Sequence, residues 1–152
     1  AFATHGLVAG DLENAEPALV LTPPETGTEL DDGLLTAGEV AQLKLNADMV
    51  ILSACNTAAG DGSEGAEGLS GLAKAFFYAG TRSLLVSHWP VFSDVAVRLT
   101  TGMLGYRATH PNSGRAEALQ QSILAVINDT SKPHYAHPIY WAPFVVVGEG
   151  GT

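Results

Sequence analysis

The feature that most constrains the fold is a short, mostly apolar run at residues 49–55, which ends in the only cysteine of the chain, Cys55. A run of this kind lacks the polar and apolar alternation of a half-exposed strand and is typical of a strand covered on both faces of a parallel sheet. A second buried run spans residues 83–87. The chain is therefore expected to supply helices for both faces of a sheet.

Strands and helices alternate along the chain. Thr36 and Glu39 form a capping box at the start of a helix that is expected to run to about residue 45, and Gly80 closes another helix. Further strands are predicted at residues 1–4 and 144–147, and helices at residues 69–78, 93–108 and 115–128. This order predicts an open, mostly parallel α/β sheet with helices on both faces.

A hairpin is predicted after the first strand, from two short β-like pieces at residues 7–9 and 18–21. Residues 22–27 are rich in Pro and Gly and are expected to form a loop. The chain opens within a strand, so we expect that amino-terminal strands of the full domain are missing.

Length and charge narrow the functional class. The 152 residues suit one domain, and the net charge of −9 disfavours nucleic-acid binding while suiting a cationic substrate. No apolar run approaches the length of a membrane helix. A single cysteine excludes an internal disulfide and indicates a reducing, cytoplasmic setting or a thiol kept for its chemistry.

His5 and Cys55 each follow a predicted strand. In open parallel sheets ligands bind beyond the carboxyl ends of the strands, so a thiol and an imidazole there suit covalent catalysis. Gly6 leaves its N–H open, and the N–H groups of Gly6 and Cys55 are candidates for an oxyanion hole. Taken alone, Cys55 also fits a small buried apolar residue and His5 a structural histidine.

Several sequence blocks resemble the CHAT family, the caspase-like domains that often accompany tetratricopeptide repeats. They span nearly the whole chain, at residues 3–6 (ATHG), 50–58 (VILSACNTA), 65–80 (GAEGLSGLAKAFFYAG), 87–91 (SHWPV) and 137–144 (HPIYWAPF). The resemblance implies the fold of caspases, separases and gingipains. It also implies a dyad of His5 and Cys55, with the N–H groups of Gly6 and Cys55 on the oxyanion. His88 departs from the family, which more often has an apolar residue there.

The strand at residues 83–87 is followed by two candidates for a substrate pocket, Trp89 and Asp94. Trp89 is expected to form an apolar wall, or else to pack in the core. Asp94 is expected to favour a basic P1 side chain, as acidic pocket residues do in relatives of the clan, or else to cap the following helix.

No metal or cofactor is expected. The Gly-rich stretch at residues 60–71 lacks the Lys and Ser/Thr of a phosphate loop, and His134 and His137 lack further ligands. The favoured hypothesis is a cysteine endopeptidase acting on protein or peptide and controlled by a repeat domain or partner protein. The alternatives are a latent or inactive caspase-like interaction module, and a hydrolase or acyltransferase with a non-peptide substrate.

Overall fold

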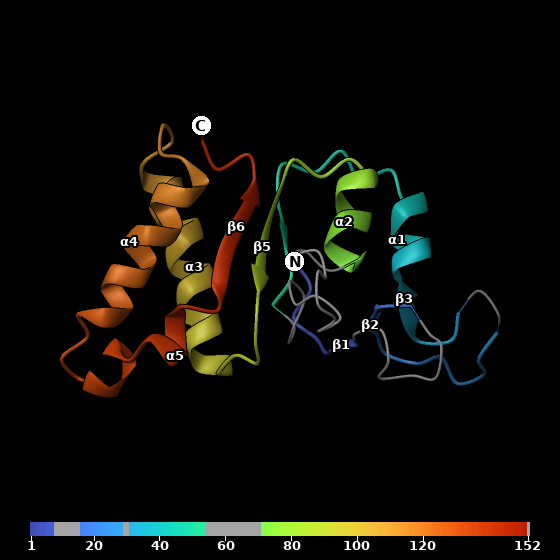
Figure 1. Ribbon diagram of the computed structural model, residues 1–152, viewed down its shortest axis with the longest axis horizontal. Helices are drawn as coiled ribbons and strands as arrows, with labels where there is room; N and C mark the ends of the chain where they lie inside the picture. Colours follow the sequence, from blue (N-terminus) through green and yellow to red (C-terminus); the bar gives the residue numbers. More distant parts are fainter. Residues whose placement is uncertain (8–15, 29–30, 54–70, 152) are drawn as a thin grey trace, which may run out of the picture.

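Five α-helices, a short 3-10 helix and two small sheets make up the part of the chain that the structure describes. The computed structural model describes residues 1–7, 16–28, 31–53 and 71–151. Figure 1 shows the larger sheet between two groups of helices, with α1 and α2 on one side and α3 and α4 on the other. Helices on both faces of the sheet were predicted from the sequence.

The larger sheet has the strand order β4 (Val50–Ile51), β5 (Ser83–Ser87) and β6 (Phe144–Gly148). β4 runs parallel to β5, with Val50 opposite Leu84. β6 runs antiparallel to β5 along its whole length. The predicted strands at residues 83–87 and 144–147 are therefore present, in a sheet of mixed direction.

The amino-terminal segment adds to the free side of β4. Phe2 forms a parallel bridge with Leu52, although the predicted strand at residues 1–4 shortens to this single bridge. The Phe2 N–H donates to the Ile51 carbonyl at 2.7 Å, and the Ser53 N–H donates to the Phe2 carbonyl at 2.9 Å. β4 is thus paired on both sides, by Phe2 and by β5.

The antiparallel direction of β6 makes this sheet mixed, so the open, mostly parallel sheet expected from the sequence is not confirmed. Two helices in succession, α3 (Ser93–Thr109) and α4 (Arg115–Ile127), connect β5 to β6 and pack against each other. α3 carries the chain away from the carboxyl end of β5, and α4 brings it back to the same edge (Figure 1). The next strand must then enter from that edge, so β6 is antiparallel to β5.

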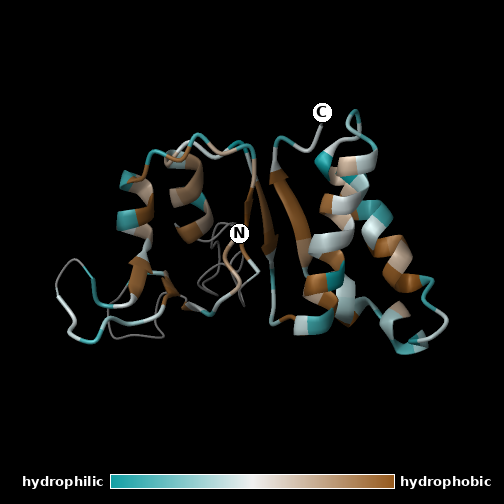
Figure 2. Cartoon of the chain, turned by 180° about the vertical axis from the view of Figure 1, so that it is seen from behind, coloured by the Kyte–Doolittle hydropathy of each residue, from teal (hydrophilic) through white to brown (hydrophobic). Residues whose placement is uncertain are grey.

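Each strand of the larger sheet buries side chains on both faces. On β5, Leu84 and Val86 join the cluster beneath α1 (Ala37–Gln42) and α2 (Gly71–Tyr78), while Leu85 joins the cluster beneath α3 and α4. All three are at most 1% exposed. The larger sheet is accordingly coloured hydrophobic in Figure 2, as the apolar runs in the sequence predicted.

The second sheet contains the predicted hairpin. β1 (Gly6–Leu7) pairs antiparallel with β2 (Ala18–Val20), and β2 pairs with β3 (Leu34–Thr36). β3 was not predicted, because residues 34–36 carry no run of β-branched side chains and directly precede a helix. The first strand of this small sheet begins at Gly6, immediately after His5.

Local signals fix the helix ends. The predicted capping box at α1 is present in full: the Thr36 side chain accepts from the Glu39 N–H, and the Glu39 carboxylate accepts from the Thr36 N–H at 2.9 Å. α1 ends at Gln42 instead of residue 45, because Leu43 adopts an extended conformation. α2 ends at Tyr78, and Gly80 (φ 95°) closes the turn that follows, where its N–H donates to the Phe77 carbonyl at 3.0 Å. A glycine is favoured there because an L side chain is disfavoured at positive φ.

We predict that Gly80→Ala lowers the free energy of unfolding by about 1–2 kcal/mol, because a Cβ is disfavoured at positive φ. Space is not the cause, since the nearest atom to the added Cβ would be the Asn46 nitrogen at 3.5 Å. Gly105→Ala is the matched control, because an added Cβ inside α3 meets nothing within 4 Å. Alanine there should leave stability unchanged or raise it by up to about 1 kcal/mol. Urea denaturation measures both variants, and equal effects at the two positions would contradict the prediction.

Candidate active site

His5 stands where the chain passes from the larger sheet to the small one. Its carbonyl accepts the N–H of Val20 at 2.9 Å, and the hydroxyl of the preceding Thr4 donates to the Val20 carbonyl. On the other side, the ring of Phe2 packs against Phe76 of α2, with 5.5 Å between the ring centroids. The backbone around His5 is therefore held on both sides, while His5 itself is exposed.

Gly6 occupies a position of β1 that leaves its N–H unused in the ladder with β2. Gly6 lies opposite Leu19, and the bond from the Val20 N–H to the His5 carbonyl flanks this pair. That pattern marks a non-hydrogen-bonded pair, in which the N–H and C=O point away from the partner strand. The N–H of Gly6 thus points away from β2.

Cys55 lies outside the described residues, as does the loop that follows it. The described part of its strand ends at Ser53, whose N–H donates to the Phe2 carbonyl. The strand that leads to Cys55 and the segment that leads to His5 are therefore directly paired.

Trp89 and His88 follow the carboxyl end of β5. Trp89 is half-buried, and its indole N–H donates to the carbonyl of Ile139 at 3.4 Å, in α5 (Pro138–Trp141). His88 is exposed, and its backbone N–H donates to the Pro143 carbonyl at 3.0 Å. Because β4 and β5 are parallel, these residues stand at the same edge of the sheet as His5.

Asp94 lies in the first turn of α3, and it is not the N-cap residue, which is Phe92. One carboxylate oxygen, Oδ1, accepts the N–H of Val95 at 2.9 Å. The other, Oδ2, accepts the hydroxyl of Tyr135 and lies 3.6 Å from the Lys132 ammonium. The hydrogen bond from Tyr135 is the main reason that the pKa of Asp94 lies below its usual value.

Sequence reasoning missed the polar cluster that surrounds Asp94. We call it the Tyr135 cluster, and it comprises Asp94, Arg98, Asp129, Lys132 and Tyr135. Tyr135, in the 3-10 helix Pro133–Ala136, is only 2% exposed, and its hydroxyl accepts from Lys132 Nζ at 2.9 Å. The hydrogen bond with Tyr135 is also the main cause that raises the pKa of Lys132.

A second ion pair closes the Tyr135 cluster. The Arg98 guanidinium lies 2.6 Å from Asp129 Oδ2 and 5.4 Å from the centre of the Tyr135 ring. Ser131 donates to the other oxygen of Asp129 through its hydroxyl and its N–H. Led by the hydrogen bond from Ser131, these contacts lower the pKa of Asp129 to about 2. The loop after α4 is thereby fastened to α3.

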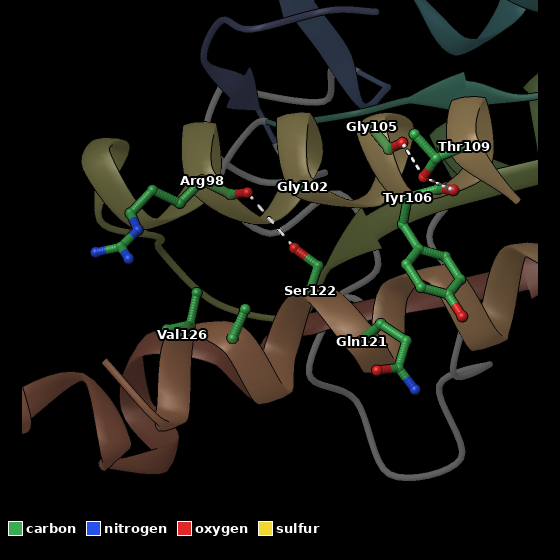
Figure 3. Close-up of a pocket in the computed structure, with 9 residues that line it drawn as sticks. Arg98, Gly102, Gly105, Tyr106, Thr109, Gln121, Ser122 and Val126 are labelled. Atoms are coloured by element: carbon green, nitrogen blue, oxygen red, sulfur yellow. Dashed lines mark hydrogen bonds between the residues drawn. The ribbon is translucent and has the colours of Figure 1, made fainter. Parts of the chain in front are cut away.

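The groove between α3 and α4 in Figure 3 contains none of the residues predicted for the site. The two helices approach closely at Gly102, where an added Cβ would lie 2.4 Å from Ser122 Oγ. Ser122 donates to the Leu99 carbonyl at 2.9 Å. Gly102 and Gly105, which carry no side chains, contribute to the lining of this groove on α3.

The two histidines weighed as metal ligands have other contacts. His137 caps α5 by accepting the Ile139 N–H at Nδ1, and the His134 ring packs edge-on against Tyr135. Among the described residues, no group of three or more His, Cys, Asp or Glu side chains is placed to hold a metal ion.

Within that same part of the chain, no helix combines the length and the hydropathy that crossing a membrane requires.

Comparison with known proteins shows the family. Residues 2–149 match the CHAT domain, so the chain belongs to the CHAT domain family, which is caspase-like. It is also similar to tetratricopeptide repeat protein 28 of Mus musculus, with 30% identity over 115 residues, or 76% of this chain. The Homo sapiens protein of that name is 30% identical over 119 residues, or 78% of this chain. The matched region is about 4% of the length of either relative.

We predict that Asp129→Asn lowers stability at neutral pH and that most of this difference is lost when the pH falls to about 2. The carboxylate has a lower pKa in the folded protein, about 2, than its ordinary value of 3.8. Its contribution is therefore present above about pH 4 and is lost as the pH falls toward 2. Thermal unfolding of both proteins at several pH values measures the difference. A destabilisation that is equally large at pH 2 would show that the charge of Asp129 is not the cause.

Proposed function

We propose that this CHAT domain is a cysteine endopeptidase with His5 and Cys55 as its dyad. The Cys55 thiolate attacks the carbonyl carbon of the scissile peptide bond, and a tetrahedral oxyanion forms. As the C–N bond breaks, the imidazolium of His5 gives its proton to the leaving amine. Water then attacks the thioester and loses a proton to the imidazole, and the C–S bond breaks to release the acid and regenerate the Cys55 thiolate beside the imidazolium of His5.

The observation that carries this proposal is the pairing of Phe2 with Leu52. The bridge is parallel, and in the sequence His5 stands three residues after Phe2, as Cys55 stands three residues after Leu52. Neighbouring parallel strands lie about 4.8 Å apart, so equal steps from a paired position lead to the same edge at nearly the same height. This register supports a thiol and an imidazole that share one substrate bond.

The orientation of Gly6 supports an oxyanion hole beside the dyad. Its N–H points away from β2, so it is open to an incoming carbonyl oxygen. Together with the N–H of Cys55 it would supply two donors to the developing charge. The loss of one such donor costs about 10²–10³ in rate in other enzymes.

Two residues at the same edge suit a substrate pocket. Trp89 presents a half-buried indole that Ile139 holds in place, which suits an apolar wall. Asp94 keeps a carboxylate that is 57% exposed, which suits recognition of a basic P1 side chain. The net charge of −9 also favours a basic substrate.

A regulatory repeat domain or partner is proposed on different grounds. The two relatives are tetratricopeptide repeat proteins by name, and the matched region is about 4% of their length. The same comparison favours the second candidate function, a caspase-like interaction module that binds a peptide without cutting it. The two candidates differ in whether Cys55 reacts.

We predict that Cys55→Ala abolishes cleavage of a peptide library, whereas the protein still unfolds cooperatively. His5→Ala is expected to slow cleavage by about 10²–10⁴, the usual contribution of a general acid–base group. Mass spectrometry of the products, together with labelling by a peptide that carries a thiol-reactive group, measures both effects.

His110→Ala provides the matched histidine control, because His110 is exposed at the opposite end of α3 and stacks on Tyr106. Cleavage and labelling should be unchanged in this variant. Retained cleavage in a clean Cys55→Ala preparation would refute the peptidase proposal. Peptide binding without labelling of Cys55 would favour the interaction module.

A further inference from the structure

The carboxylate that we propose for the P1 side chain, that of Asp94, already has a cation of the protein beside it. Lys132 Nζ lies 3.6 Å from Asp94 Oδ2 and 2.9 Å from the hydroxyl of Tyr135, which also donates to Asp94. A basic side chain of a substrate would seek the same carboxylate. The ammonium of Lys132 therefore occupies the place of such a ligand.

We propose that Lys132 is a specificity-determining residue, an internal competitor that a basic substrate side chain must displace from Asp94. The proposal rests on the proposed peptidase function, in which Asp94 faces the P1 side chain. The substrates are then peptides that contain arginine. Lys132 weakens the binding of every basic ligand by the same factor, because each ligand must displace it from Asp94.

The position of Lys132 is built into the fold. The backbone N–H of Lys132 donates to the Asp129 carbonyl at 3.0 Å. Asp129 is in turn held to α3 by its ion pair with Arg98. Arg98 and Asp94 are four residues apart on α3 and so lie on one helix face. Arg98 forms an ion pair with the carboxylate of Asp129. Lys132 instead contacts the carboxylate of Asp94.

The contact between Lys132 and Asp94 is weak enough to be replaced. The two side chains are 45% and 57% exposed, and their charged atoms are 3.6 Å apart. Exposed ion pairs of this kind contribute little, because water screens them. An arginine side chain can bind a carboxylate through two parallel N–H···O bonds, so it competes better than a single ammonium.

Tyr135 makes the exchange possible without loss of the pocket. It is 2% exposed, and its hydroxyl donates directly to Asp94, so this bond does not run through Lys132. The Lys132 ammonium also lies 4.8 Å from the centre of the Tyr135 ring, so part of its contact survives when it leaves the carboxylate. Tyr135 is thus the positioning residue for Asp94.

The test is peptide binding by fluorescence anisotropy, with the full chain carrying Cys55→Ala so that the peptides stay intact. Two labelled peptides are compared that differ only at P1, with arginine in one and its neutral isostere citrulline in the other. Lys132→Met is expected to tighten the arginine peptide by about two- to fivefold, the value of an exposed ion pair, and to leave the citrulline peptide unchanged.

Three further variants make the result specific. Lys132→Gln keeps a donor for the Tyr135 hydroxyl but removes the charge, so it should reproduce the tightening if Lys132→Met disturbs the fold. With Asp94→Asn in the background, Lys132→Met should have no effect on either peptide. Lys44→Met, at an exposed lysine after α1, gives the effect of the lost charge alone, which should be small.

Equal changes for both peptides, no change for either, or no detectable binding of the arginine peptide would each overturn the proposal. Tightening that persists in the Asp94→Asn background would also overturn it, because Lys132 would then act elsewhere. Cleavage by the protein with Cys55 intact is measured separately. Cleavage without the effect of Lys132 would therefore leave the peptidase standing while this inference fails.

Discussion

The pairing of β4 on both sides organises the rest of the structure. Leu52 donates its N–H to the Leu85 carbonyl at 2.8 Å on one side and pairs with Phe2 on the other, and Val50 and Ile51 bury their side chains on opposite faces. This short strand therefore aligns three segments that are distant in the sequence. Because all three run in one direction, the chain emerges from each at a single edge of the sheet. That alignment places His5, Trp89 and the first turn of α3 at one edge of the sheet.

Local signals in the sequence were sufficient for much of the fold. The capping box of Thr36 and Glu39 and the glycine at position 80 depend on neighbours within a few residues, and the strand Ser83–Ser87 shows its burial directly in its composition. The direction of β6 was not predicted from the sequence, although the order of the elements bears on it. Two consecutive helices with no strand between them, α3 and α4, return the chain to the edge at which β5 ends, so the next strand runs in the opposite direction.

The candidate site was predictable only in part. His5 and Cys55 stand out because few side chains combine their chemistry at strand ends, and the family blocks place them in context. The Tyr135 cluster gave no such signal, because Tyr135 and Asp94 are 41 residues apart and both are common residue types. Their contact depends on how the loop after α4 returns to the start of α3. A pairing of this kind arises from tertiary packing, which no pattern along the chain records.

The hairpin of α3 and α4 also determines where the domain can carry an added segment. α3 has 17 residues, so the turn at its far end lies about 25 Å along the helix from Asp94. Pro111 and Asn112 in that turn are exposed. A fluorescent reporter or a tether inserted between them would project from the side of the molecule remote from the candidate site. The same turn is a position at which evolution could lengthen the domain without obstructing a bound peptide.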